Sequence, residues 1–515
     1  MKRRLSLALE SLGSSRKRPQ FTSGAGILAL LAVSVLIMSC GGSSSSSSNN
    51  NPAPPSVPSI QNINNSTDPS SPINLPIEIN GSGFQGSPGK VVFTQASSGI
   101  AATVTPNAAG WTDHGVVANV PKGDGTNSFT VPGTISVAVT TSGGTSNAIS
   151  LTLAQTLAFN VNSLGWTTTT PLPVALTGLR AVAVPIDSLK AFVVVTGGFD
   201  GAANSSNVYC NTISPTGAVG PSWTTIPTNI LPQTVAYHAM VEADSTNSPV
   251  STGSHFIYVL GGQVTSGGTP GGTTNVYMAG VDSNSGAVGT WTQLASSLPV
   301  PLVGAAAALS NGYVYVVGGL NADSTPSANV YSAPVKSDGT LGAWTQQSAN
   351  PYPLAISFAT EFGYAGRLYV LGGDPTGSIS PGAQGSPGIN NVNFATILNG
   401  VVGTWTTTSS TIVKRKKQAT WTAFGQVIDA EGVYDGNSGS QELEASSINA
   451  DGTLMQWTGI AAGDSPGANV YNAAAIVSPL QSPASTPRFL LLGGQGFATI
   501  GIGSLSSQVF FNNAP

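Results

Sequence analysis

A short apolar segment that ends in a glycine pair recurs along residues 156–515, and this repeat limits the possible folds more than any other feature. Five complete copies end in the pairs that begin at Gly197, Gly261, Gly318, Gly372 and Gly493. The first four pairs are 64, 57 and 54 residues apart, and the last interval of 121 residues contains a degraded sixth copy at 427–432. Such a period indicates a chain built from six similar supersecondary units.

Two aromatic positions recur in phase with the glycine pairs. Tyr209, Tyr277 and Tyr331 precede a tryptophan by 14, 14 and 13 residues. Glycine and threonine interrupt every possible helical turn, so the pattern excludes amphipathic helices and predicts short strands joined by turns. The tryptophans, each followed by threonine, are Trp166, Trp223, Trp291, Trp344, Trp405 and Trp457.

This combination of an apolar strand, a glycine pair, a tyrosine strand and a tryptophan strand resembles the kelch motif of β-propellers. The resemblance implies an all-β chain with a six-bladed kelch-type β-propeller over residues 156–515. The unit is longer than the usual kelch repeat of about 50 residues, and the fifth unit lacks the glycine pair. Because Trp166 precedes the first pair, its strand is expected to close the propeller as the outer strand of the last blade, beside residues 508–511.

Alternating apolar segments broken by turn residues predict a small β-sandwich over residues 57–155. Its motifs are Gly-Ser-Gly-Phe at 81–84, Val-Val-Phe at 91–93, Val-Pro at 120–121 and Val-Ala-Val-Thr-Thr-Ser-Gly-Gly-Thr-Ser-Asn at 137–147. They resemble an IPT/TIG domain, which has an immunoglobulin-like fold. The resemblance implies a structural role, as a spacer or as a partner of the following domain.

The N-terminus has the features of a targeting segment. Basic residues precede the apolar run 27–38, which is too short to span a bilayer as a stable helix and suits the apolar region of a signal peptide. The run leads into Leu-Ile-Met-Ser-Cys at 36–40, which resembles a bacterial lipobox. The resemblance implies a lipoprotein signal peptide at 1–39 and a lipidated Cys40. An uncleaved N-terminal membrane helix is the alternative. The Ser-, Asn- and Pro-rich residues 40–56 are expected to be a disordered tether.

Composition excludes several classes of protein. Charged residues make up only 7% of the chain, against about 25% in an average soluble domain. From position 40 onward there are 11 basic and 20 acidic residues, a balance that excludes a general nucleic-acid binder. The two cysteines, Cys40 and Cys210, exclude a disulfide framework.

Catalytic groups are scarce in this sequence. The three histidines are His114, His238 and His255. A metal site would need His238 and His255 together on neighbouring strands of one hairpin, and we favour a structural role for His238. Kelch-type copper radical oxidases need a fuller ligand set than Cys210, Tyr237 and His238 provide. We therefore predict a protein that is not an enzyme and holds no cofactor and no metal.

Recognition is expected on one face of the propeller. The polar segments after the glycine pairs are long, and the starts of the inner strands should surround a funnel on the same face. Aromatic rings and a few polar groups there would suit a glycan or a peptide. The expected residues of this face are Arg180, Tyr237, His238, Phe358, Trp421, Tyr471 and Asn472.

A run of four cations, Lys414, Arg415, Lys416 and Lys417, falls just before the inner strand of the fifth unit. The sequence places it at the rim of the same face, where it would either capture an anionic group or form a solvated loop. A pocket in which Arg, Glu and His converge would favour an enzyme, whereas a funnel lined by Gly, Ala, Val and aromatic residues would favour binding.

These features together predict a bacterial cell-envelope protein, extracytoplasmic and attached to the membrane through lipidated Cys40. Gly41 at the position after the cysteine favours the outer membrane of a Gram-negative cell. The predicted function is a binding or scaffold protein for an extracellular or envelope glycan or protein. The alternative is a carbohydrate-active kelch enzyme, similar to sialic-acid mutarotases or to galactose oxidase. The ligand and the oligomeric state stay open.

Overall fold

Strands make up the regular structure of the chain, as the repeat predicts, and no α-helix occurs among the residues described here. The computed structural model describes residues 54–513 except for 64–69, 75, 107, 109–110, 112, 155–163, 188, 227, 246, 252, 266–270, 378–387, 424, 435–441, 450, 461–465, 467–469, 481–486 and 498–501. Residues from Pro54 onward form one compact unit. In its described part the protein is all-β.

Several predictions concern residues outside this part. The signal peptide at 1–39, the lipidation of Cys40 and all of the tether at 40–56 except its last three residues lie outside the described residues. The proposed boundary at 155–156 does so too. Over the residues that are described, the chain has no helix that is both long enough and apolar enough to cross a membrane.

Residues 59–154, here called the two-sheet lobe, contain two sheets that share one apolar core. Side chains from both sheets meet in this core, among them Ile79, Val116, Phe93 and Val137. The first sheet has the order β1 (Ser59–Ile63), β3 (Pro76–Ser82) and β6 (Gly115–Asn119). The second has the order β2 (Ser70–Pro72), β9 (Ile149–Ala154), β7 (Gly133–Thr141), β4 (Lys90–Gln95) and β5 (Ile100–Val104), with β8 (Gly144–Thr145) beside β7.

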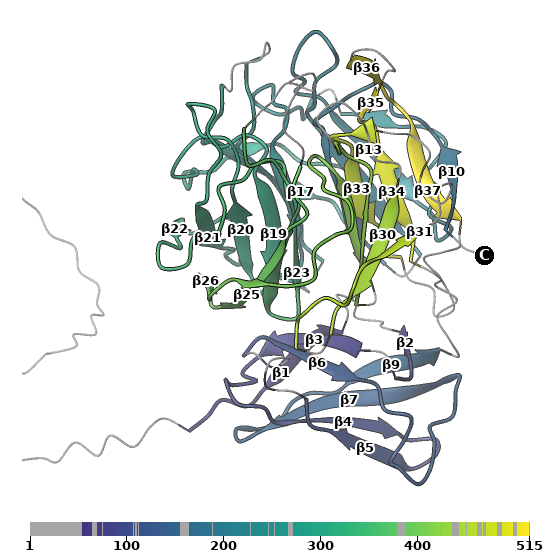
Figure 1. Cartoon of the computed structure of the whole chain (residues 1–515). Coiled ribbons are helices and arrows are strands. Elements are labelled where there is room, and N and C mark those ends of the chain that lie inside the picture. Colours follow the sequence, from purple (N-terminus) through teal and green to yellow (C-terminus); the bar gives the residue numbers. More distant parts are fainter. Residues whose placement is uncertain are drawn as a thin grey trace, which may run out of the picture. The chain divides into compact units, whose positions relative to one another are not determined.

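Residues 164–513, here called the six-sheet lobe, contain six antiparallel sheets, each built largely from consecutive strands (Figure 1). The first three are β11 (Arg180–Pro185), β12 (Ala191–Thr196), β13 (Val208–Ile213) and β14 (Thr224–Thr225); β15 (Ala239–Ala243), β16 (His255–Leu260), β17 (Val276–Val281) and β18 (Thr292–Gln293); and β19 (Ala306–Ser310), β20 (Tyr313–Val317), β21 (Val330–Pro334) and β22 (Thr345–Gln346).

The next two sheets follow the same plan, and the last one takes a strand from the start of the lobe. They are β23 (Thr360–Tyr364), β24 (Arg367–Leu371) and β25 (Val392–Leu398) with β26 (Val401–Val402) and β27 (Thr406–Thr407); β28 (Ala419–Ala423), β29 (Gln426–Ala430), β30 (Leu443–Ser447) and β31 (Thr458–Ile460); and β33 (Ala474–Val477), β34 (Phe489–Leu492), β37 (Val509–Asn513) and β10 (Gly165–Thr169). A small additional sheet consists of β32 (Val470–Tyr471), β35 (Gln495–Phe497) and β36 (Ile502–Leu505).

The sequence repeat corresponds to one strand position in every sheet. The apolar segments before the glycine pairs form the second strands β12, β16, β20, β24 and β34, as predicted. Both glycines of each pair have positive φ, and a Cβ on Gly318 would lie 2.4 Å from the carbonyl oxygen of Ile356. The degraded copy keeps this backbone, because Glu431 (φ 60°) and Gly432 (φ 89°) stand where the other units have two glycines. In the five complete pairs, positive φ and close packing together favour glycine, whereas Glu431 adopts the same backbone conformation as a non-glycine residue.

The predicted pairing of the Trp166 strand with the end of the chain is confirmed. β10 pairs antiparallel with β37, and Trp166 lies opposite Asn512. In Figure 1, β10 accordingly runs beside the yellow C-terminal strand β37. Two segments that are far apart in sequence thus belong to the same sheet.

The six sheets pack in cyclic order, because a separate apolar core lies between each sheet and the next. One core joins the second and third sheets through Tyr258 and Val314, and another joins the last and first sheets through Leu490 and Val193. The remaining four cores lie between the other neighbouring pairs. The first strands of the sheets follow the same order, since β11 contacts both β15 and β33.

A closed ring of backbone hydrogen bonds links these inner strands just before they begin. Each amide nitrogen donates to the carbonyl oxygen of the preceding member over 2.7–3.0 Å, and the bond from Gly178 to Asn472 completes the circle. All six residues have positive φ, between 51° and 64°. The members, called the ring residues below, are Gly178, Tyr237, Gly304, Phe358, Lys417 and Asn472.

Candidate functional site

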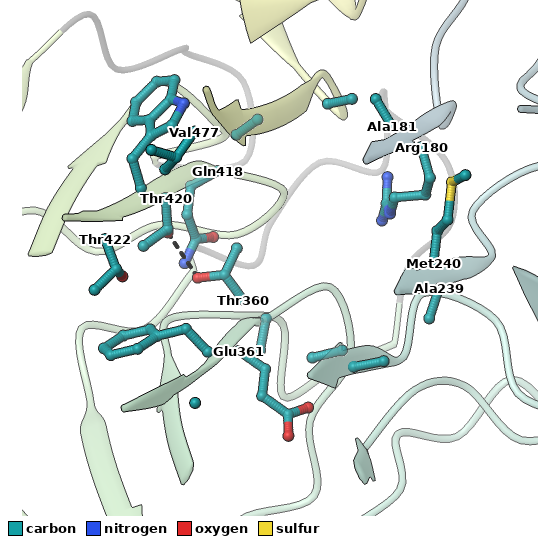
Figure 2. A pocket seen from close by; sticks show the side chains of 18 of the residues that line it. Arg180, Ala181, Ala239, Met240, Thr360, Glu361, Gln418, Thr420, Thr422 and Val477 are labelled. Carbon is teal, nitrogen blue, oxygen red and sulfur yellow. Dashed lines mark hydrogen bonds between the residues drawn. The ribbon is translucent and has the colours of Figure 1, made fainter. Parts of the chain in front are cut away.

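A cavity of about 490 Å³ lies among the inner strands β11, β15, β19, β23, β28 and β33 (Figure 2). Its volume falls within the range of small-molecule sites, about 300–1,000 Å³. Alanine side chains on the inner strands are too small to fill the space between these strands. The lining includes Ala181, Ala239, Ala306, Ala359, Ala423 and Ala474. The polar and charged lining residues are Glu78, Arg180, Thr360, Glu361, Lys417, Gln418, Thr420, Thr422, Asn472 and Ser478.

The cavity is closed at the end where the ring residues lie. The rings of Tyr237 and Phe358 come from alternate strands and meet edge to face, 5.9 Å apart. The two side chains are only 6% and 3% exposed, whereas Phe362 and Val477 near the other ends of their strands are half-buried. The end of the cavity at the ring is therefore filled by buried aromatic side chains.

This geometry corrects one expectation from the sequence. The open funnel was expected at the starts of the inner strands, on the side of the long polar loops. Instead the aromatic rings of Tyr237 and Phe358, two of the ring residues, meet there and fill the middle. Of the expected face, Arg180, Phe358, Lys417, Trp421 and Asn472 line the cavity. Tyr237, His238, Tyr471, Lys414, Arg415 and Lys416 are absent from its lining.

Arg180 is one of two cations among the described residues that line the cavity. It begins β11, is half-buried, and donates from Nη1 to the carbonyl oxygen of Leu179 over 2.9 Å. Within the described residues no carboxylate forms an ion pair with it. Burial lowers its pKa to about 10, so that the guanidinium stays charged at neutral pH. Figure 2 shows the side chain projecting into the cavity across from Gln418 and Thr420.

Lys417 is a second cation at the closed end. Its Nζ lies 4.6 Å from the ring centre of Phe358 and 6.0 Å from that of Tyr471. Burial, together with the neighbouring charge of Lys416, lowers the pKa of Lys417 to about 7. An anion in the cavity would favour the charged form of this amine.

The rest of the basic run is internal, which corrects the expectation of an exposed cationic rim. Arg415 is 1% exposed and forms ion pairs with Glu444 and, over 3.0 Å, with Asp429. Lys416 is also buried and binds Asp374 over 2.7 Å. Only Lys414 faces solvent. Arg415 and Lys416 thus form ion pairs with carboxylates on other strands and loops.

Glu361 is a buried acid at the wall of the cavity. It lies on β23, and neither of its carboxylate oxygens has a hydrogen-bond partner or contact with solvent. Burial alone raises the pKa of Glu361 well above its usual range, which favours the protonated form. Glu361 was not among the residues expected from the sequence, although the equivalent positions of β11, β19 and β33 are Ala181, Ala307 and Ala475.

One wall of the cavity combines hydroxyls with an aromatic ring. Thr360 and Thr420 share a hydrogen bond of 2.8 Å between their hydroxyls, drawn as a dashed line in Figure 2. The indole nitrogen of Trp421 donates to the carbonyl oxygen of Leu490 over 3.0 Å, which fixes the ring in place. The Trp421 ring is only 1% exposed and packs against Trp166 and Phe489, so the hydroxyls are the groups of this wall that are left to contact a sugar.

The two histidines of the hairpin β15–β16 lie at its opposite ends. His238 precedes β15 and is fully buried; its Nε2 lies 2.9 Å from the Thr196 hydroxyl, and burial lowers its pKa to about 3. His255 begins β16, and its Nδ1 lies 3.0 Å from Oε1 of Glu242. The register of the hairpin separates the two histidines by its whole length, so they cannot share a metal ion.

A possible metal-ligand cluster does exist at the far end of that hairpin. Ligand atoms of Glu242, Asp244 and His255 lie within 4.8 Å of one another. The hydrogen bond between His255 and Glu242 already accounts for this arrangement.

Cys210 is not a candidate nucleophile. Burial raises the pKa of its thiol to about 12, so the reactive thiolate form is disfavoured.

Comparison with known proteins adds no family to this description. The chain matches no protein-family model and no curated protein. The function is therefore inferred from the cavity and its side chains.

Proposed function

We propose that this chain is an envelope-anchored binding protein whose six-sheet lobe is a six-bladed kelch-type β-propeller. Six antiparallel sheets of four or five strands in cyclic order, separate cores between neighbours and the closed hydrogen-bond ring support this proposal. The two-sheet lobe, with its shared core, supports the proposal of an immunoglobulin-like IPT/TIG domain. The lipid anchor at Cys40 is proposed from the lipobox-like sequence alone.

We propose further that the cavity binds an acidic sugar, such as the terminal residue of an envelope glycan. The observation that carries this is Arg180, a guanidinium that lines a small-molecule-sized cavity without forming an ion pair among the described residues. A planar guanidinium matches the two oxygens of a carboxylate. The hydroxyls of Thr360 and Thr420, which line the same cavity, supply hydrogen-bond acceptors for the rest of a sugar.

A titration with D-glucuronate tests this function, with D-glucose as the neutral control of the same size. The full chain in detergent should bind glucuronate and should bind glucose much more weakly, as measured by isothermal titration calorimetry. Arg180→Gln should weaken glucuronate binding by about tenfold or more, because a hydrogen bond to a charged group is lost. Lys336→Gln, which removes an exposed cation on a distant turn, is the matched control. Equal binding by the wild type and Arg180→Gln would reject the proposal.

One observation favours the enzymatic alternative. Burial raises the pKa of Glu361 well above its usual range, as a general acid that acts on a sugar would need. Its oxygens are shielded, however, and no histidine is among the lining residues. Binding is therefore the function that this geometry supports better.

A further inference from the structure

One wall of the cavity comes from outside the six-sheet lobe. Glu78 of β3, in the two-sheet lobe, is among the lining residues together with Tyr364 of β23. Its carboxylate accepts a hydrogen bond from the amide nitrogen of Ala365, in the turn between β23 and β24. Burial raises the pKa of Glu78 to about 7. A side chain of the two-sheet lobe therefore holds the turn that ends β23.

Strand alternation explains why Glu78 and its neighbours point away from their own core. On β3, Ile77 and Ile79 face the core of the two-sheet lobe, so Glu78 faces outward, and yet it is only 3% exposed. On β6, Val117 likewise points away from that core and packs against Tyr364 and Ala365. Both outward side chains are buried by the six-sheet lobe.

The contact leaves no room for adjustment at its centre. A Cβ on Gly115 would lie 2.8 Å from the backbone of Ala365 and Gly366. Next to it, Nε2 of His114 lies 2.6 Å from Oδ1 of Asn399, in the turn between β25 and β26. These four residues of the two-sheet lobe therefore contact two turns of the six-sheet lobe, one at Ala365 and Gly366 and the other at Asn399.

We infer that the two-sheet lobe is part of the ligand site: it forms a wall of the cavity at the end opposite the ring residues, and ligand affinity depends on its docking there. This inference rests on the proposed function. Docking acts through the turn at Ala365, which sets the position of β23 and therefore of Thr360 and Glu361. Glu78 is a positioning residue in this account, and the lobe is more than a spacer.

Gly115→Val tests the inference by obstructing the docking contact. Valine suits a strand position, so the two-sheet lobe should keep its fold while the lobes separate. Gly86→Val is the matched control, because a Cβ at Gly86 meets no atom within 4 Å. Calorimetry should show one unfolding transition for the wild type and Gly86→Val, and two for Gly115→Val. Glucuronate should bind Gly115→Val about tenfold more weakly or worse, and Gly86→Val normally.

A second pair of variants addresses Glu78 directly. Glu78→Ala removes the acceptor for the Ala365 amide and should weaken glucuronate binding, whereas Glu78→Gln keeps an acceptor oxygen and should restore it. Undiminished, Arg180-dependent binding by Gly115→Val with separated lobes would overturn the inference and leave the proposed function standing. Binding that does not depend on Arg180 in the wild type would overturn both.

Discussion

The amide nitrogen of Gly178 donates a hydrogen bond of 3.0 Å to the carbonyl oxygen of Asn472, and this bond joins the first inner strand to the last. The lack of a side chain at Gly178 also matters, because a Cβ there would lie 2.5 Å from the ring of Tyr237. Gly304 makes the same room for Phe358. Large side chains thus lie over neighbouring glycines and close one end of the cavity, which leaves the other end for a ligand.

The glycine pairs should be needed for close packing as well as for positive φ. Gly318→Ala places a Cβ 2.4 Å from the carbonyl oxygen of Ile356 at φ 67°. Gly99→Ala has a similar φ of 69° but meets no atom within 4 Å. We expect Gly99→Ala to cost about 1 kcal/mol of unfolding free energy from backbone strain. Gly318→Ala should cost clearly more in the same denaturation experiment. Equal losses of unfolding free energy in the two variants would show that positive φ alone explains why glycine occupies these positions.

The buried cation Arg415 should stabilise the fold through its two carboxylate partners. Arg415→Met leaves Asp429 and Glu444 buried without their cation, which should lower the unfolding free energy by about 3–5 kcal/mol. Lys414→Met, next to it in sequence but exposed, should change the unfolding free energy by less than about 0.5 kcal/mol. Chemical denaturation measures both. A mild effect of Arg415→Met would mean that the ion cluster adds little to stability.

Glu361 should make the protein less stable as the pH rises. Its pKa in the folded state lies above the ordinary value of 4.5, so its contribution to stability is complete below pH 4.5 and is lost as the pH rises toward the folded pKa. Glu361→Gln removes this titration. The difference in unfolding free energy between variant and wild type should therefore shift in favour of the variant from pH 4 to pH 8, by up to about 1.4 kcal/mol per pH unit. A difference that stays constant with pH would contradict this account of Glu361.

Periodicity predicted the strands well because it reports local structure. The glycine pairs, the tyrosine strands and the pairing of the Trp166 strand all follow from spacing along the chain. The environment of the basic run could not be predicted from spacing, because the packing of the sheets brings Asp374, Asp429 and Glu444 to it. Charge in a sequence therefore does not distinguish a solvated run from a set of internal ion pairs.

The cavity was predicted in part, for a similar reason. Arg180 stood out as a cation at the start of an inner strand. Glu361 could have been found by aligning the six inner strands, since it stands where three others have alanine. Glu78 could not have been found from the sequence, because its role depends on how the two lobes dock and no sequence repeat relates one lobe to the other.

A crystal structure of the protein with bound D-glucuronate tests the central claim most directly. We predict that the carboxylate of the sugar lies within hydrogen-bond distance of the Arg180 guanidinium, inside the cavity among the inner strands. Glucuronate bound only on the loops beyond the ring residues, with the cavity empty, would contradict the account.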